Sequence, residues 1–193
     1  MADAGDMNGA ENTLYEELDT SNMEYLEMAL TFYMYLNQFK DDVLYTANYS
    51  REEIVEGIKA ECGQDFPVSI RMGMKSYIKG FHKPSLFGDE EAGRTIEEAC
   101  EIAKLLESYG YDMLDCNSGI YDSFYYAVAP AYMDKGYNIK LAKEIKKHVS
   151  IPVFVAGKMN DPELCEQAIA NGEIDGVALG RAGLADGAYP QKL

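Results

Sequence analysis

The chain has 193 residues, of which 47% are hydrophobic and 26% are charged, and its formal net charge is −16. This composition is ordinary for a globular protein, and the length suits one domain with a substantial core. Because nucleic acids and anionic membrane surfaces repel so acidic a chain, neither is expected as a partner.

The first 49 residues form an acidic segment that we expect to be partly helical or flexible. Residues 1–39 contain eight Asp or Glu and no Lys or Arg. Residues 23–36 are apolar nearly all round, which suits either a buried helix or a strand followed by a turn. The N-terminus lacks the basic region of a secretory signal, so a cytoplasmic location is expected.

From residue 50 onward the sequence alternates between strands and helices. The expected strands cover residues 67–72, 111–117, 151–157 and 174–180. Helices are expected to begin at the capping boxes Ser50–Glu53 and Thr95–Glu98 and at Asp161-Pro162, and a basic helix is expected over 138–148. The strands are continuous apolar runs, which is typical of a parallel sheet covered on both faces.

This alternation predicts an α/β fold, a partial (βα)8 barrel of about the last four βα units over residues 50–193. A complete barrel needs about 250 residues, so the chain has room for roughly half of one. Half a barrel leaves two open sheet edges. We therefore expect a homo-oligomer or a partner chain that completes the barrel, or else a truncated gene product.

Two glycine–cation pairs follow the last two expected strands, namely Gly157-Lys158 and Gly180-Arg181. Glycine lets a ligand approach the backbone, and the loops after the last two barrel strands commonly bind phosphate. Taken together, the two pairs predict a phosphate site. Taken singly, each pair is better explained as a strand end followed by a solvated cation.

Arg71 is a charged residue within an apolar strand, so it must be paired or face a polar site. It fits either an ion pair with a neighbouring carboxylate such as Asp115 or a cation beside an electron-rich cofactor ring. Tyr121 belongs to a tyrosine-rich loop that also contains Tyr125 and Tyr126. The loop could supply a proton donor, or it could be a packed aromatic cluster.

The four cysteines, at positions 62, 100, 116 and 165, match no zinc or iron–sulfur spacing. No metal site is therefore predicted.

Five runs of this sequence resemble one known family. They are DFPVSIRM (65–72), KSYIKG (75–80), GRTIEEACEIAKLLESYGYDMLDCNSGIYDS (93–123), IPVFVAGKMNDPELCEQAI (151–169) and IDGVALGRAGLAD (174–186). Residues 50–193 resemble the second half of the enoate reductase, 2,4-dienoyl-CoA reductase and bile-acid reductase branch of the old yellow enzyme family.

The resemblance implies an FMN-binding barrel that takes hydride from NAD(P)H and reduces an activated C=C bond of a small unsaturated substrate. In it Arg71 faces the flavin, and the two glycine–cation pairs bind its phosphate. Tyr121 lies near the substrate. Tyr35, in the run YLNQF (35–39), resembles a catalytic tyrosine. The family's first four strands have no counterpart here, and the chain stops before the cysteine cluster of larger members, so no iron–sulfur cluster is expected.

A phosphate-binding half-barrel with other chemistry is one alternative that the residues allow, and two further functions are compatible with the resemblance. The chain is either an NAD(P)H:flavin oxidoreductase of the ene-reductase type, complete or truncated, or a non-catalytic half-barrel that binds FMN or phosphate or needs a partner chain.

Overall fold

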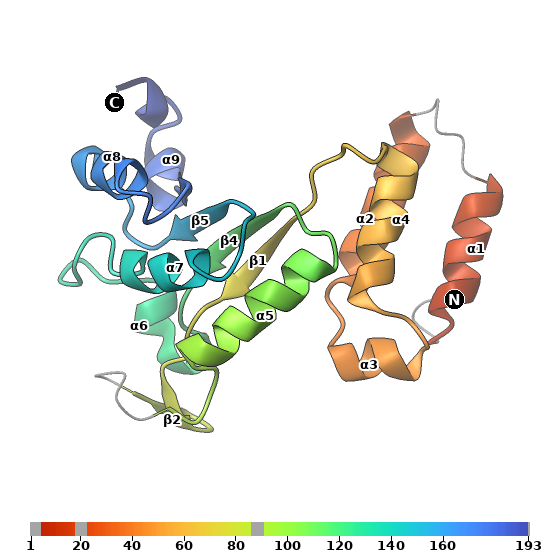
Figure 1. Cartoon of the computed structure of the whole chain (residues 1–193), viewed down its shortest axis with the longest axis horizontal. Helices are drawn as coiled ribbons and strands as arrows, with labels where there is room; N and C mark the ends of the chain where they lie inside the picture. The colour runs from red at the N-terminus through yellow and green to blue at the C-terminus, as the bar shows by residue number, and fades with distance from the viewer. Residues whose placement is uncertain (1–4, 18–22, 86–90, 193) are drawn as a thin grey trace. The chain divides into compact units, whose positions relative to one another are not determined.

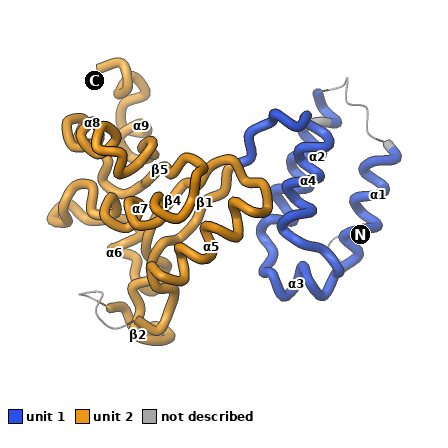
Figure 2. Tube along the Cα trace, in the orientation of Figure 1, with its two compact units in different colours: residues 1–68 blue, residues 69–193 orange. Residues whose placement is uncertain are grey.

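The computed structural model describes residues 5–17, 23–85 and 91–192 (Figure 1). The chain divides into two compact units, residues 1–68 and 69–193, which Figure 2 colours separately. This division falls after residue 68, and the domain boundary expected at residues 49/50 stays a prediction. None of the described helices is long and apolar enough to cross a membrane.

Unit 1 is helical in its described part. Its helices are α1 (Met7–Glu17), α2 (Met23–Leu36), α3 (Asp41–Thr46) and α4 (Arg51–Cys62). The apolar run 23–36 is thus a helix, which decides between the two alternatives that periodicity left open. The buried core of the unit comprises Met7, Tyr33, Leu36, Leu44, Tyr49 and Ile54.

A partly buried polar network lies beside this helical core. The Glu11 carboxylate accepts hydrogen bonds from the hydroxyls of Tyr33 (2.9 Å) and Tyr49 (2.5 Å). The hydroxyls of Tyr33 and Tyr15 lie 2.8 Å apart. Burial is the main cause that raises the pKa of all three tyrosines, so they remain neutral donors near neutral pH.

Unit 2 is built on a parallel sheet, as the sequence predicts. The sheet contains β1 (Ser69–Gly73), β4 (Met113–Asn117), β5 (Val153–Ala156) and β6 (Gly176–Ala178), in the order β1-β4-β5-β6. All three neighbouring pairs are parallel. The α/β class is therefore confirmed.

Two longer helices of unit 2, α5 (Ile96–Ser108) and α8 (Pro162–Ala170), begin where their caps predict, and α7 (Ile139–Lys146) lies within the basic run expected over 138–148. The Thr95 hydroxyl accepts from the Glu98 N–H (3.3 Å) and the Glu98 carboxylate accepts from the Thr95 N–H (2.9 Å), which is a complete capping box. The Asp161 carboxylate accepts from the Leu164 N–H (3.3 Å) and so caps α8, with Pro162 as the first helical residue.

Replacing Thr95 by Ala should lower the free energy of unfolding of unit 2 by about 1 kcal/mol, because the first turn of α5 loses a backbone partner. Urea unfolding measures this change. Thr95→Ser keeps the hydroxyl and serves as the control. A Ser variant as unstable as the Ala variant would mean that the threonine methyl group, and not the cap, matters.

The two faces of the sheet differ because side chains alternate along each strand. Helices α5 and α7 lie across one face (Figure 1). On it Leu114, Cys116, Val153 and Val155 are completely buried. The alternate positions Arg71, Asp115 and Phe154 point the other way and are less buried. One face is therefore core, and the other carries polar groups.

Several short elements carried no recognisable sequence pattern. The strands β2 (Ile78–Gly80) and β3 (Lys83–Pro84) form an antiparallel hairpin. The others are η2 (Tyr121–Ser123), α6 (Phe124–Ala127), α9 (Arg181–Ala185) and η3 (Tyr189–Lys192).

Candidate active site at the carboxyl edge of the sheet

Five predicted positions meet at one cavity of about 560 Å³ in unit 2. Arg71 lies on β1, Gly157-Lys158 directly follows β5, and Gly180-Arg181 follows β6 and begins α9. They gather because parallel strands end at the same edge of a sheet. The other residues lining the cavity are Ala127, Val128, Ala129, Ala131, Ala156, Met159, Asn160, Ala178, Leu179 and Ala182.

Arg71 forms an ion pair and also lines the cavity. Arg71 and Asp115 are register partners on neighbouring strands, and the guanidinium lies 3.4 Å from the Asp115 carboxylate. The predicted ion pair is thus present. The Arg71 side chain is nevertheless 60% exposed and lines the cavity, so its guanidinium is also accessible to a ligand. The second oxygen of Asp115 is buried and has no hydrogen-bond partner among the described residues.

The Lys158 side chain holds the loop that forms one wall of the cavity. Its ammonium donates to the carbonyls of Pro130 (3.2 Å), Ala131 (2.7 Å) and Met133. An ammonium has three N–H donors, so these three bonds occupy all of them. Arg181 donates to the carbonyl of Ala129 on the same loop (3.1 Å). A guanidinium has five N–H donors, so this bond leaves others for a ligand.

The two glycines have different physical roles. Gly157 has φ +123°, and a Cβ there would lie 2.7 Å from the amide nitrogen of Asn138. Asn138 is completely buried and donates to the carbonyl of Ala156 (2.7 Å), which fixes the end of β5. At Gly180, by contrast, no described atom lies within 4 Å of the position of a Cβ. Gly157 is required by packing, whereas Gly180 keeps the cavity open.

Neither candidate tyrosine lines this cavity. Tyr121 lies on η2 and is 94% exposed. Tyr35 lies on α2 in unit 1. The neighbouring tyrosines form the packed cluster that the sequence allowed: the rings of Tyr126 and Tyr77 stack at 3.6 Å, and those of Tyr126 and Tyr125 lie 4.9 Å apart.

An acid–base pair holds the β2–β3 turn against the Tyr121 segment. The Asp122 carboxylate accepts from the backbone N–H of His82 (3.0 Å), and its other oxygen lies 2.9 Å from the Nδ1 atom of His82. These hydrogen bonds lower the pKa of Asp122. The pair joins residues 40 positions apart, and this contact carries no signal in the sequence.

The cysteines behave as small core residues. Cys100, Cys116 and Cys165 are buried free thiols, and Cys62 is partly buried. Burial, with a smaller contribution from Asp115, raises the pKa of Cys116 to about 12. No group of three or more metal-ligating side chains gathers within the described ranges.

The loop 127–133 is the part of the site that the sequence did not reveal. It forms one wall of the cavity through small side chains, and its carbonyl oxygens bind both cations. Backbone carbonyls are the same at every residue, so no residue type could have marked them.

Two family models match the chain. Residues 50–193 match the NADH:flavin oxidoreductase / NADH oxidase family, and residues 1–64 match a family of unknown function (DUF6483). The two matches overlap over residues 50–64, which contain α4.

Curated relatives match the second part. A cinnamate reductase of Clostridium sporogenes is 46% identical over 143 residues, which are 73% of this chain and 22% of the relative. An NADH oxidase of Thermoanaerobacter brockii is 38% identical over 140 residues, 72% of this chain and 20% of the relative. The chain thus spans about a fifth of the length of the curated relatives it matches.

Solved structures are also similar to this chain. A 2-naphthoyl-CoA reductase in complex with 2-naphthoyl-CoA has a TM-score of 0.58 at 31% identity, covering 73% of this chain and 20% of that one. A histamine dehydrogenase from Rhizobium sp. 4-9 has the same TM-score at 22% identity, covering 81% of this chain and 21% of that one, and so indicates the fold alone.

Proposed function

The chain belongs to the NADH:flavin oxidoreductase / NADH oxidase family through residues 50–193, and from this premise we propose that it binds FMN and serves the reduction of an activated C=C bond by NADH or NADPH. The observation that carries the proposal is the single cavity lined by Arg71, Gly157, Lys158, Gly180 and Arg181. Its volume of about 560 Å³ falls within the range of cofactor sites.

The residues present fit a flavin mononucleotide. Arg181 has unused guanidinium donors beside the open position Gly180, and these suit a phosphate. Lys158 holds the loop wall that the flavin would contact, and Arg71 presents its guanidinium to the same space. Bound FMN would supply the hydride acceptor and donor, and the protein would orient it and tune its environment. We propose that this chain binds no iron–sulfur cluster.

We propose Tyr121 as the residue that protonates the substrate. Its hydroxyl belongs to a segment fixed by the His82–Asp122 pair and lies in unit 2 with the cavity. Tyr35 is the second candidate. The variants Tyr121→Phe and Tyr35→Phe separate them. We expect the first to slow alkene reduction without changing flavin reduction by NADH, and the second to change neither. The reverse pattern would assign the role to Tyr35.

We further propose that residues 50–193 form half of a (βα)8 barrel, preceded by a separate acidic segment over residues 1–49. Among the described residues, β1 and β6 each have a strand neighbour on one side only. Such edges invite further strands. A second copy or another chain would then complete the barrel and the flavin site.

The test uses the full chain, FMN and dialysis. Retained flavin with a shifted visible absorption band would support the proposed site. NADH oxidation that depends on cinnamate, the compound in the name of one relative, would support the proposed reaction. Flavin retention without cinnamate-dependent turnover would favour the non-catalytic half-barrel. Loss of all flavin on dialysis would contradict the proposed site.

A further inference from the structure

The sheet face that points away from α5 and α7 carries one row of residues across all four strands of unit 2. Arg71 on β1 is in register with Asp115 on β4. Asp115 is in register with Phe154 on β5, and Phe154 is in register with Gly176 on β6. A Cβ at Gly176 would lie 2.6 Å from the Phe154 ring, so this ring fills the space above the glycine. The row therefore consists of a cation, an anion, a large ring and a residue without a side chain.

The carboxylate in this row is incompletely satisfied. One oxygen of Asp115 lies 3.4 Å from the Arg71 guanidinium, whereas a charge-assisted hydrogen bond is about 2.7–2.9 Å long. The other oxygen is buried and has no hydrogen-bond partner among the described residues. The neighbour on its other side, Phe154, has an apolar side chain that offers no donor. Because an unpaired buried carboxylate oxygen is costly, we expect a second chain to supply its donor.

Two copies of this row would satisfy each other in a closed barrel of eight strands. Strands about 4.8 Å apart and tilted by about 36° offset register partners by only about 3 Å along the barrel axis. Both copies of Arg71 and of Asp115 would therefore lie near one level, and each Arg71 would face the Asp115 of the other copy. The two Gly176 positions would leave room for the two Phe154 rings.

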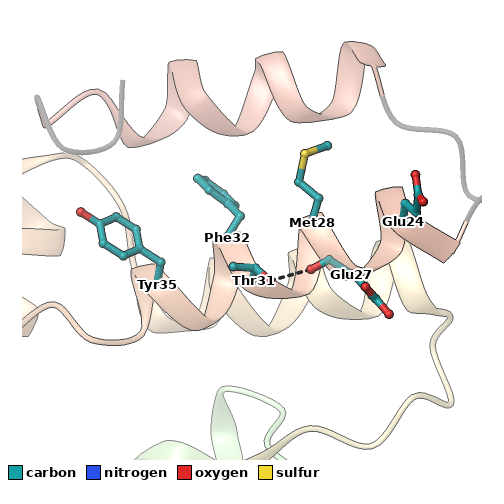
Figure 3. A pocket seen from close by; sticks show the side chains of 6 residues that line it. All are labelled: Glu24, Glu27, Met28, Thr31, Phe32 and Tyr35. Carbon is teal, nitrogen blue, oxygen red and sulfur yellow. Dashed lines mark hydrogen bonds between the residues drawn. The ribbon is translucent and has the colours of Figure 1, made fainter.

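The distribution of charge also favours contact between copies through unit 2. Exposed groups of α2 in unit 1 are engaged within that unit: Phe32 packs against its core, and the Thr31 hydroxyl donates to the Glu27 carbonyl (2.7 Å; Figure 3). Residues 1–68 contain 3 Lys or Arg and 15 Asp or Glu, whereas residues 69–193 contain 14 and 18. Two copies of the chain thus repel each other least through unit 2.

We propose that a second copy of this chain is the partner that completes the site, and that its Arg71 donates to the unpartnered oxygen of Asp115. Together the two copies form a neutral cluster of two guanidinium groups and two carboxylates beside the cavity that Arg71 lines. Each copy supplies both members of the contact, so no other chain is needed to match the charges. The inference rests on the half-barrel proposed above and names its partner.

Charge reversal tests this contact in the full chain without flavin. Sedimentation velocity should show that the wild-type chain is a dimer. Arg71→Asp and Asp115→Arg each leave four like charges in the cluster, so each variant should dimerise at least about 100-fold more weakly. An equimolar mixture of the two variants restores both pairs and should dimerise again. The matched controls, Lys104→Asp and Glu101→Arg, reverse the charges of an exposed pair on α5 and should leave the dimer intact.

A wild-type monomer would overturn the inference. So would a dimer that neither reversal weakens, or one that mixing the two variants fails to restore. Protection of the buried Cys116 thiol from labelling shows whether each variant is folded. Dialysis with FMN separates this result from the flavin proposal, because a monomer that retains FMN would contradict the second copy alone, and a dimer that retains none would contradict the flavin site alone.

Discussion

Replacing Gly119 by Ala should destabilise unit 2 by about 2–5 kcal/mol. Gly119 has φ +81°, a conformation that costs an L-residue about 1–2 kcal/mol. A Cβ there would also lie 2.4 Å from the backbone nitrogen of Ala127 and 2.8 Å from the carbonyl carbon of Tyr126. Backbone atoms cannot rotate away as a side chain can, so overpacking adds about 1–3 kcal/mol.

The readout is specific to unit 2. Cys116 on β4 is completely buried, so its thiol labelling in increasing urea, read by mass spectrometry, reports the opening of the sheet. Gly172→Ala is the matched control, because Gly172 also has a positive φ (+66°) but no described atom within 4 Å of a Cβ. Equal shifts for Gly119→Ala and Gly172→Ala would show that the backbone contact contributes nothing.

Replacing Lys158 by Met should weaken the binding of FMN and of riboflavin by a similar factor, about 10- to 100-fold. Hydrogen bonds to a charged group contribute about 1.5–3 kcal/mol, and here three of them hold the loop wall of the cavity. Because the wall contacts any flavin, the loss does not depend on the phosphate. Fluorescence quenching of each flavin measures the two affinities.

Arg181→Gln is the matched comparison, since it removes the cation with free donors. We expect this variant to bind FMN more weakly and to bind riboflavin with unchanged affinity. Hydrogen exchange adds a readout that needs no flavin: the Met133 amide, bonded to the Pro130 carbonyl, should exchange faster in Lys158→Met. If Lys158→Met weakened the binding of FMN alone, Lys158 would be a direct phosphate ligand, and the role assigned to it in holding the loop would be wrong.

The sequence predicted the sheet well because apolar runs and caps are local signals. The helix starts after Ser50, Thr95 and Asp161 agree with the structure. The observed strands begin about two residues later than the apolar runs. The run from residue 151 gives β5 at Val153–Ala156, because a strand is defined by its ladder bonds and not by hydrophobicity alone. The sequence did not decide whether residues 23–36 form a helix or a strand, because a helix that is apolar on several sides has no diagnostic period.

The site was predictable to the extent that it depends on strand ends. Arg71, Lys158 and Arg181 meet because any parallel sheet brings such positions to one edge. Asp115 could be named as a partner of Arg71, but the partners of Lys158 and Arg181 were not predictable. The contacts of the cations with the carbonyls of loop 127–133, and the pairing of His82 with Asp122, depend on which distant backbone segments the fold brings together. Strands as short as β2 and β3 also lie below the length at which alternation can be recognised.

The order β1-β4-β5-β6 has a consequence for assembly. Among the described strands the two edges of this sheet are β1 and β6, so copies that joined edge to edge in one parallel sheet would meet head to tail, β6 to β1, through a heterologous interface. If the twist of two joined sheets brings the last edge back to the first, the ring closes after two copies and growth stops. If it does not, the same contact repeats without limit and yields a fibre. Light scattering at rising concentration distinguishes a particle of fixed size from one that keeps growing.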